Sequence, residues 1–184
     1  LVPPVAVPGQ LAVGVLAARG AAGPVGPPGV EAQAQLGKDP VVQLLSRAAD
    51  GNFVHHLWME KPCPADNPTF QQAFFDEGRF YPRMEGRNVF VNACQRMPES
   101  VRQGLEKNGL TIEDIDVLIP HQANDRISLM VAKGLKIPVV KVIRNIDRFG
   151  NTTAASIPIA LDEAVKSGRI KRGNLVAMTA FGSG

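Results

Sequence analysis

The feature that most constrains the fold of this chain is a regular alternation of helix-like and strand-like segments after Glu85. Helical patterns cover residues 87–95, 98–108, 123–135 and 152–166, and apolar strand-like runs cover residues 117–120, 139–146 and 175–181. Strands that alternate with helices in this way are typical of a layered α/β sheet. The pattern leaves the direction of the strands open.

The part of the chain before Glu85 is less regular. Residues 11–18 and 41–45 are expected to form strands, and most of 19–40 stays unassigned because glycine and proline interrupt every pattern. We therefore divide the chain into a poorly defined Pro/Gly-rich segment, 1–40, and a domain covering 41–184. The Pro-rich stretch 60–83 has the character of a binding loop or lid.

Composition excludes several classes of protein. Hydrophobic residues make up 45% of the chain and charged residues 20%, as in a soluble globular domain. Aromatic residues are only 5%, which argues against a surface that stacks nucleic-acid bases. The sequence shows neither a signal peptide nor a long uncharged apolar helix that would indicate a membrane protein. The two cysteines have no metal-binding or disulfide spacing, so the sequence predicts a cytoplasmic protein without a metal site.

Charge is distributed unevenly along the sequence. From position 121 onward ten Lys/Arg stand against four acidic residues, whereas the first 120 positions carry ten basic and thirteen acidic residues. Such a basic half suits an anionic partner, either a phosphate group or an acidic protein. An ordinary solvated surface would have the same composition, so both explanations stay open.

Two polar residues, His121 and Asn151, each follow a strand-like run and precede a helix-like run. Open α/β sheets bind ligands at such strand ends. A neutral imidazole and a carboxamide that point to one place can stabilise a developing oxyanion or enolate. The alternatives are that His121 has a purely structural role and that Asn151 closes a turn after Gly150.

At these residues the chain resembles the C-terminal half of a β-ketoacyl-[acyl-carrier-protein] synthase III, a condensing enzyme of the thiolase-like superfamily. The resemblance is carried by residues 84–90 (MEGRNVF), 116–124 (DVLIPHQAN), 148–158 (RFGNTTAASIP), 160–164 (ALDEA), 168–171 (GRIK) and 180–184 (AFGSG). It extends from about residue 49 to residue 184. It implies one βαβαβ-type half of the duplicated thiolase-like fold, a mixed sheet with helices on both faces.

The resemblance also implies a reaction, the decarboxylative Claisen condensation of an acyl-CoA primer with malonyl-acyl-carrier-protein in fatty-acid or polyketide-like biosynthesis. Both substrates are transient partners, no cofactor is bound permanently, and the family forms homodimers. His121 and Asn151 are implied to stabilise the oxyanion. The remaining implied residues are Gly182 and Ser183 as a backbone oxyanion loop, Asn124, Ala123, Gly86 and Phe90 as contacts of CoA or pantetheine, and Arg126 as a contact of the acyl carrier protein.

Simpler roles exist for several of these residues. Asn124 is also a good N-cap for the helix over 123–135, and Gly86 and Phe90 could simply start a helix and face its core. The Gly182–Ser183 segment could be an ordinary turn.

The nucleophilic cysteine of the family has no counterpart in this sequence. Cys63 falls in the irregular loop and Cys94 on a core-facing helix, and neither lies in the family's nucleophile motif. We therefore expect the chain to supply the His/Asn half of an incomplete active site. The alternatives are a binding or pairing subunit that lacks the nucleophile, a truncated product, or a relative that transfers acyl groups without condensation.

Overall fold

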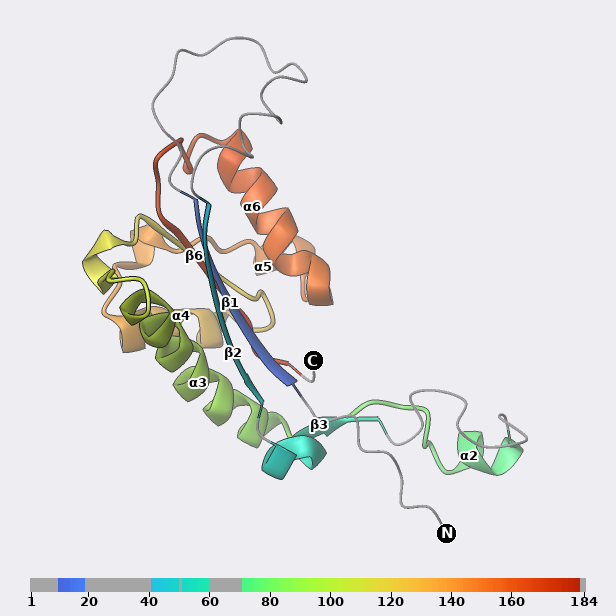
Figure 1. Ribbon diagram of the computed structural model, residues 1–184. Helices are drawn as coiled ribbons and strands as arrows, with labels where there is room; N and C mark the ends of the chain where they lie inside the picture. The colour runs from blue at the N-terminus through green and yellow to red at the C-terminus, as the bar shows by residue number, and fades with distance from the viewer. Residues whose placement is uncertain (1–9, 19–40, 50, 60–70, 183–184) are drawn as a thin grey trace.

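The computed structural model describes residues 10–18, 41–49, 51–59 and 71–182. The predictions made for residues 19–40, for Cys63 and for Ser183 therefore lie outside the described residues. Within them, the chain forms an α/β fold in which strands are flanked by helices on both faces (Figure 1).

The strands form a mixed arrangement. β1 (Gln10–Ala18) pairs antiparallel with β2 (Val41–Ala49), whereas β5 (Val117–Pro120) runs parallel to β6 (Val176–Thr179). β1 lies beside β6, so the two pairs stand next to each other (Figure 1). The pairing of β1 with β2 also crosses the boundary predicted at residue 40, and the division into two regions stays a prediction. Two further short strands, β3 (Leu57–Trp58) and β4 (Arg83–Met84), pair outside this group.

Two layers of helices enclose these strands. α3 (Gly86–Glu106) and α4 (Asp125–Leu135) cover one face, and α6 (Ser156–Lys166) covers the other (Figure 1). The shorter helical segments are η1 (Gly51–His56), α2 (Gln72–Asp76), η2 (Ile112–Asp114), η3 (Val139–Lys141), α5 (Ile146–Phe149) and η4 (Thr153–Ala155). The predicted helices on both sides of a mixed sheet are thus confirmed.

The core consists of two clusters that share β5. Leu118 belongs to the cluster under α3 and α4, whereas Val117 and Ile119 belong to the cluster under α6. All four residues of β5 are buried. A strand covered on both faces needs apolar residues at successive positions, which explains why this run lacks the usual alternation. The strand therefore delivers the residue after it, His121, from the centre of the fold.

The prediction of two helices separated before Pro98 is wrong, because α3 continues through that residue. Pro98 is buried against α4. A Cβ atom added at Gly134 would lie 3.1 Å from Pro98 Cγ, so the glycine permits the close approach of the two helices. Packing against α4 thus stabilises a helix that the proline would otherwise weaken.

The predicted strand over residues 139–146 is also wrong. Val139–Lys141 form a 3-10 helix. Among the described residues the segment reaches the sheet at Val142, through one parallel bridge to Leu118, and at Ile143, whose N–H donates to the Leu118 carbonyl at 2.9 Å. Val140 is 79% exposed, and the Lys141 ammonium donates to the Ile115 carbonyl at 2.6 Å. β-branched residues favour strands only where a neighbouring strand and a buried face are available, and among the described residues Val139 and Val140 have neither.

The contact between Gly134 and Pro98 gives a first prediction. Replacing Gly134 with valine should destabilise the protein by about 1–3 kcal/mol, because the new side chain meets a buried ring in another helix. Lys133→Val is the matched control, since Lys133 is exposed on the same helix and should lose only about 0.5 kcal/mol of helix propensity. Urea unfolding of both variants measures the difference, and equal losses would contradict the proposed steric cause.

Candidate functional site

His121 is held where β5 ends. Its backbone N–H donates to the Thr179 carbonyl at the end of β6, at 2.8 Å, and its carbonyl accepts from the Ala123 N–H at 2.9 Å. The first bond continues the parallel pairing of β5 and β6, and the second closes a tight turn. The backbone of this histidine is therefore fixed by the sheet itself, and its ring starts from the carboxyl end of two parallel strands.

The His121 ring contacts α6. Its Nδ1 atom lies 2.5 Å from Oγ of Ser156, the first residue of that helix. Burial of the ring lowers the pKa of His121, which favours the neutral imidazole. The other ring nitrogen, Nε2, makes no hydrogen bond to any residue that the structure describes. A neutral ring with one anchored nitrogen can therefore present the other nitrogen to a ligand.

Asn151 lies in an exposed turn before α6. Gly150 enters this turn with a φ of +67°, and Asn151 Oδ1 accepts from the Thr153 N–H at 2.9 Å. This is the turn role that we considered as an alternative. No hydrogen bond joins Asn151 to His121 within the described residues, but both contact the same short segment, because Ser156 follows closely after the turn. The turn uses the amide oxygen of Asn151, and no described residue accepts from its NH₂ group.

Behind His121, a buried amide ties the loops together. Gln122 is 1% exposed, and its NH₂ group donates to the carbonyls of Pro120 at 2.6 Å and Ile143 at 3.3 Å. Its Oε1 accepts from the Asn145 backbone N–H at 3.0 Å. The three bonds satisfy the buried amide and fix the segment before α5 against the end of β5.

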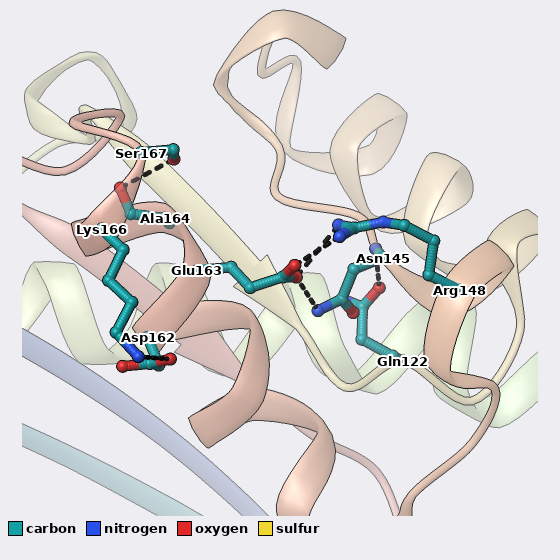
Figure 2. A network of polar contacts seen from close by, with 8 residues as sticks. All are labelled: Gln122, Asn145, Arg148, Asp162, Glu163, Ala164, Lys166 and Ser167. Atoms are coloured by element: carbon teal, nitrogen blue, oxygen red, sulfur yellow. Dashed lines mark hydrogen bonds and ion pairs between the residues drawn. The ribbon is translucent and has the colours of Figure 1, made fainter.

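This network continues to α6 through Glu163 (Figure 2). The Glu163 carboxylate accepts from Asn145 Nδ2 at 2.7 Å and receives both terminal nitrogens of Arg148, one of them at 3.0 Å. The series of hydrogen bonds from Gln122 to Arg148 thus connects the His121 loop with the segment that leads into Asn151. The sequence patterns predict no role for Gln122, Asn145 or Glu163. A polar residue directly after the buried run of β5, such as Gln122, is nevertheless a detectable signal.

The hydrogen bonds to Glu163 predict a pH-dependent stability. Arg148 first, and then Asn145, hold the pKa of the Glu163 carboxyl below its ordinary value. A carboxyl with a lowered folded-state pKa stabilises the protein above its unfolded-state pKa, and this stabilisation disappears as the pH falls through the folded-state value. Wild-type protein should therefore be more stable than Glu163→Gln at neutral pH, and the difference should shrink under acid conditions.

Urea unfolding of wild-type protein and Glu163→Gln at a series of pH values below neutral checks this result. Asp162→Asn is the matched control, because Asp162 lies next to Glu163 and forms only an exposed ion pair with Lys166, at 2.8 Å. A constant difference between wild type and Glu163→Gln at all pH values would show that the carboxylate charge is not the cause.

The residues that were predicted to contact pantetheine lie at the starts of α3 and α4. Asn124 caps α4, since its Oδ1 accepts from the Arg126 N–H at 2.9 Å, which confirms the capping role considered for it. The Arg126 guanidinium lies 5.6 Å from the centre of the Phe90 ring, so the two helix starts are in contact. Gly86 begins α3 one turn before Phe90 and is exposed, and Ala123 is half-buried.

The remaining predicted residues have simpler surroundings. Gly182 follows β6, and a Cβ atom added there would meet no described atom within 4 Å. Cys94 lies on α3 and packs against the core, as predicted, and burial raises the pKa of its thiol. Among the residues that the structure describes, no group of three His, Cys, Asp or Glu side chains could hold a metal ion, and no helix is long and apolar enough to cross a membrane.

Comparison with known proteins shows which family this chain resembles. The family model described as "3-Oxoacyl-[acyl-carrier-protein (ACP)] synthase III C terminal" matches residues 105–184. A β-ketoacyl-[acyl-carrier-protein] synthase III from Methylococcus capsulatus is 46% identical over 146 residues, which cover 79% of this chain and 43% of that protein. One from Aquifex aeolicus is 53% identical over 104 residues, covering 56% of this chain and 34% of the relative.

Solved structures give the same result. The crystal structure of the Aquifex aeolicus synthase III aligns with a TM-score of 0.60 and 44% identity, over 72% of this chain and 38% of that one. The Thermus thermophilus enzyme aligns with a TM-score of 0.63 and 38% identity, over 74% of this chain and 40% of that one. The chain therefore spans less than half the length of these relatives.

Proposed function

Because this chain is similar in sequence and in its thiolase-like fold to the C-terminal part of β-ketoacyl-[acyl-carrier-protein] synthases III, we propose that it supplies the His/Asn half of a condensing active site. The reaction would be the decarboxylative Claisen condensation of an acyl-CoA primer with malonyl-acyl-carrier-protein in fatty-acid biosynthesis. No permanently bound cofactor is needed. The protein would act in the cytoplasm, with acyl-CoA and the acyl carrier protein as transient partners, and the complete enzyme as a homodimer.

One observation carries this proposal: His121 is an imidazole anchored at the carboxyl end of two parallel strands, and its burial lowers its pKa and so favours the neutral form. In the reaction, a cysteine thiolate attacks the acyl-CoA carbonyl and releases CoA, which leaves an acyl-cysteine. Malonyl-acyl-carrier-protein then loses carbon dioxide, and the resulting enolate attacks the acyl-cysteine and displaces the thiolate. Nε2 of His121 would donate to the malonyl thioester oxygen while this oxygen carries the enolate charge.

Asn151 would provide the second donor. Its oxygen is already occupied by the Thr153 N–H, so the carboxamide presents its NH₂ group as the free hydrogen-bonding end. An oxyanion is stabilised by hydrogen-bond donors, so this orientation of the Asn151 carboxamide suits the proposed role. The backbone N–H groups of Gly182 and Ser183 would serve the acyl-cysteine carbonyl in the same way.

The starts of α3 and α4 would bind the pantetheine arm. Gly86, Phe90, Ala123 and Asn124 would contact the arm, and Arg126 would contact the carrier protein. Support comes from the contact of Arg126 with Phe90, which joins both helix starts into one surface. The carrier protein is expected to be acidic, and the exposed guanidinium suits it.

The nucleophile would come from another part of the enzyme. Cys94 is a poor candidate because burial raises the pKa of its thiol and thus lowers the thiolate fraction. This observation also favours a second candidate function, in which the protein lacks the nucleophile and only binds the carrier protein or pairs with a catalytic subunit.

The deciding experiment mixes acetyl-CoA and malonyl-acyl-carrier-protein with the purified enzyme in which this chain is joined to the nucleophile-bearing part, and follows two masses. The first is the intact mass of the protein, which gains one acetyl group if a nucleophile is present. The second is the mass of the carrier protein, which changes from malonyl to β-ketoacyl if condensation occurs. Formation of β-ketoacyl-carrier-protein supports the proposal. A folded protein that binds the carrier protein but gains no acetyl group and forms no product would instead be the binding subunit.

A further inference from the structure

The hydroxyl of Ser156 has two neighbours and almost no contact with solvent. Its Oγ lies 2.5 Å from His121 Nδ1 and 3.3 Å from the Gln122 backbone nitrogen. Ser156 is 2% exposed. Both partners come from the loop after β5, whereas Ser156 itself begins α6. The hydroxyl is therefore a contact between the two segments that carry His121 and Asn151.

The direction of these two hydrogen bonds follows from the groups involved. The Gln122 backbone N–H is a donor in every state of the protein, so Ser156 Oγ must accept from it. The serine proton then needs an acceptor of its own. Within the described residues the hydroxyl has one other hydrogen-bonding neighbour, the His121 ring. If Nδ1 carried a proton, the buried serine proton would have no acceptor, at a cost of about 1–3 kcal/mol.

We infer that Ser156 is a positioning residue that donates to Nδ1 of His121 and thereby fixes the neutral ring as the tautomer with its proton on Nε2. This inference rests on the proposed function, in which Nε2 must donate to the thioester oxygen. It identifies Ser156 as the residue that makes Nε2 the donor nitrogen of His121. The same bond disfavours the imidazolium, because a proton on Nδ1 would face the serine proton.

The position of Ser156 explains why this hydroxyl can act on the ring so specifically. It is the first residue of α6, and the rest of that helix is anchored through Ala160 and Ala164, which are buried in the cluster beneath β5 and β6. The hydroxyl is thus held by a helix that packs on the same strands as the His121 loop. An ordered donor loses little conformational entropy when it forms its bond.

Nitrogen NMR of protein labelled at histidine tests this inference directly. In wild-type protein at neutral pH, His121 should show a pyridine-type Nδ1 and a pyrrole-type Nε2. In Ser156→Ala, the two nitrogen signals of His121 should move toward each other, since both neutral tautomers become populated. Ser156→Cys, with a similar size and a weaker donor, should give an intermediate result and replaces Ser156→Ala if that variant does not fold.

The matched control is Ser167→Ala, which removes a serine hydroxyl at the other end of α6 that donates to the Ala164 carbonyl (Figure 2). It should leave the His121 signals unchanged. The inference is overturned if wild-type His121 carries its proton on Nδ1, or if the His121 signals are the same in wild type and folded Ser156 variants.

Catalysis is measured separately, so that the two proposals can fail independently. If the protein condenses its substrates, Ser156→Ala should lower kcat about tenfold, the effect of one hydrogen bond, with little change in KM for malonyl-acyl-carrier-protein. If no condensation occurs but the His121 signals respond to Ser156→Ala, the proposed function fails and the role of Ser156 stands.

Discussion

Replacing His121 with alanine is expected to lower the rate of β-ketoacyl product formation by about 10²–10³-fold, the usual cost of losing one oxyanion donor. The reason is that Nε2 of this ring is the group proposed to stabilise the enolate, while Nδ1 only anchors the ring. The measurement is the rate of conversion of malonyl- to β-ketoacyl-carrier-protein at saturating substrates. Acetylation of the enzyme, assembled with its nucleophile-bearing part, should continue, because the proposed acyl-loading step does not use His121.

His55→Ala is the matched control for this prediction. His55 is exposed and packs edge-on against Trp58, at 5.0 Å between ring centres. It should leave the rate unchanged. If His121→Ala also keeps the wild-type rate while the protein stays folded, His121 has a structural role, which was the alternative considered from the sequence.

Replacing Leu118 with alanine is expected to cause the largest loss of stability, about 2–5 kcal/mol. Leu118 is 0% exposed and lies in β5 under α3 and α4, so truncation leaves a cavity that the surrounding helices cannot easily fill. Urea unfolding of both proteins gives the difference in free energy of unfolding. The dependence of this free energy on urea concentration is measured for each protein separately.

Leu161→Ala provides the control for this loss, because Leu161 has the same chemistry but is only half-buried on α6. It should cost clearly less than Leu118→Ala. Equal losses would mean that the protein does not depend on the double-sided burial of β5 that we describe.

The parts of the fold that followed from the sequence are those where one local signal agreed with the packing. The Asn124 N-cap starts α4 where the periodic pattern begins. β5 was recognisable because a short apolar run ended at a proline and a polar residue. In each case the local pattern and the buried face require the same structure.

The errors arose where local propensity and tertiary contacts disagreed. The pattern at 139–146 favours a strand, but no strand in the described part of the chain covers Val139 and Val140. Pro98 usually interrupts a helix, but its contact with Gly134 keeps α3 continuous. No property of one segment reveals such a contact, because each depends on a residue far away in the chain.

The candidate site shows the same division. His121 and Asn151 could be selected from the sequence, since each is a polar residue at the end of a strand-like run. The residues that hold the surrounding loops could not be selected in this way. Ser156, Asn145 and Glu163 are ordinary polar residues in the sequence, and only the fold brings them to the His121 loop and its hydrogen-bond network. The sequence thus indicates which groups could do chemistry, and the structure shows what holds them.

The bond from the His121 N–H to the Thr179 carbonyl has a consequence for biosynthesis. A ribosome releases β5 long before β6, and until Thr179 has emerged β5 can form only its single bridge to Val142. The nascent chain therefore carries an unpaired, fully apolar strand edge, which is the kind of surface that aggregates or recruits chaperones. The loop that holds His121 is consequently completed only after β6 has been synthesised.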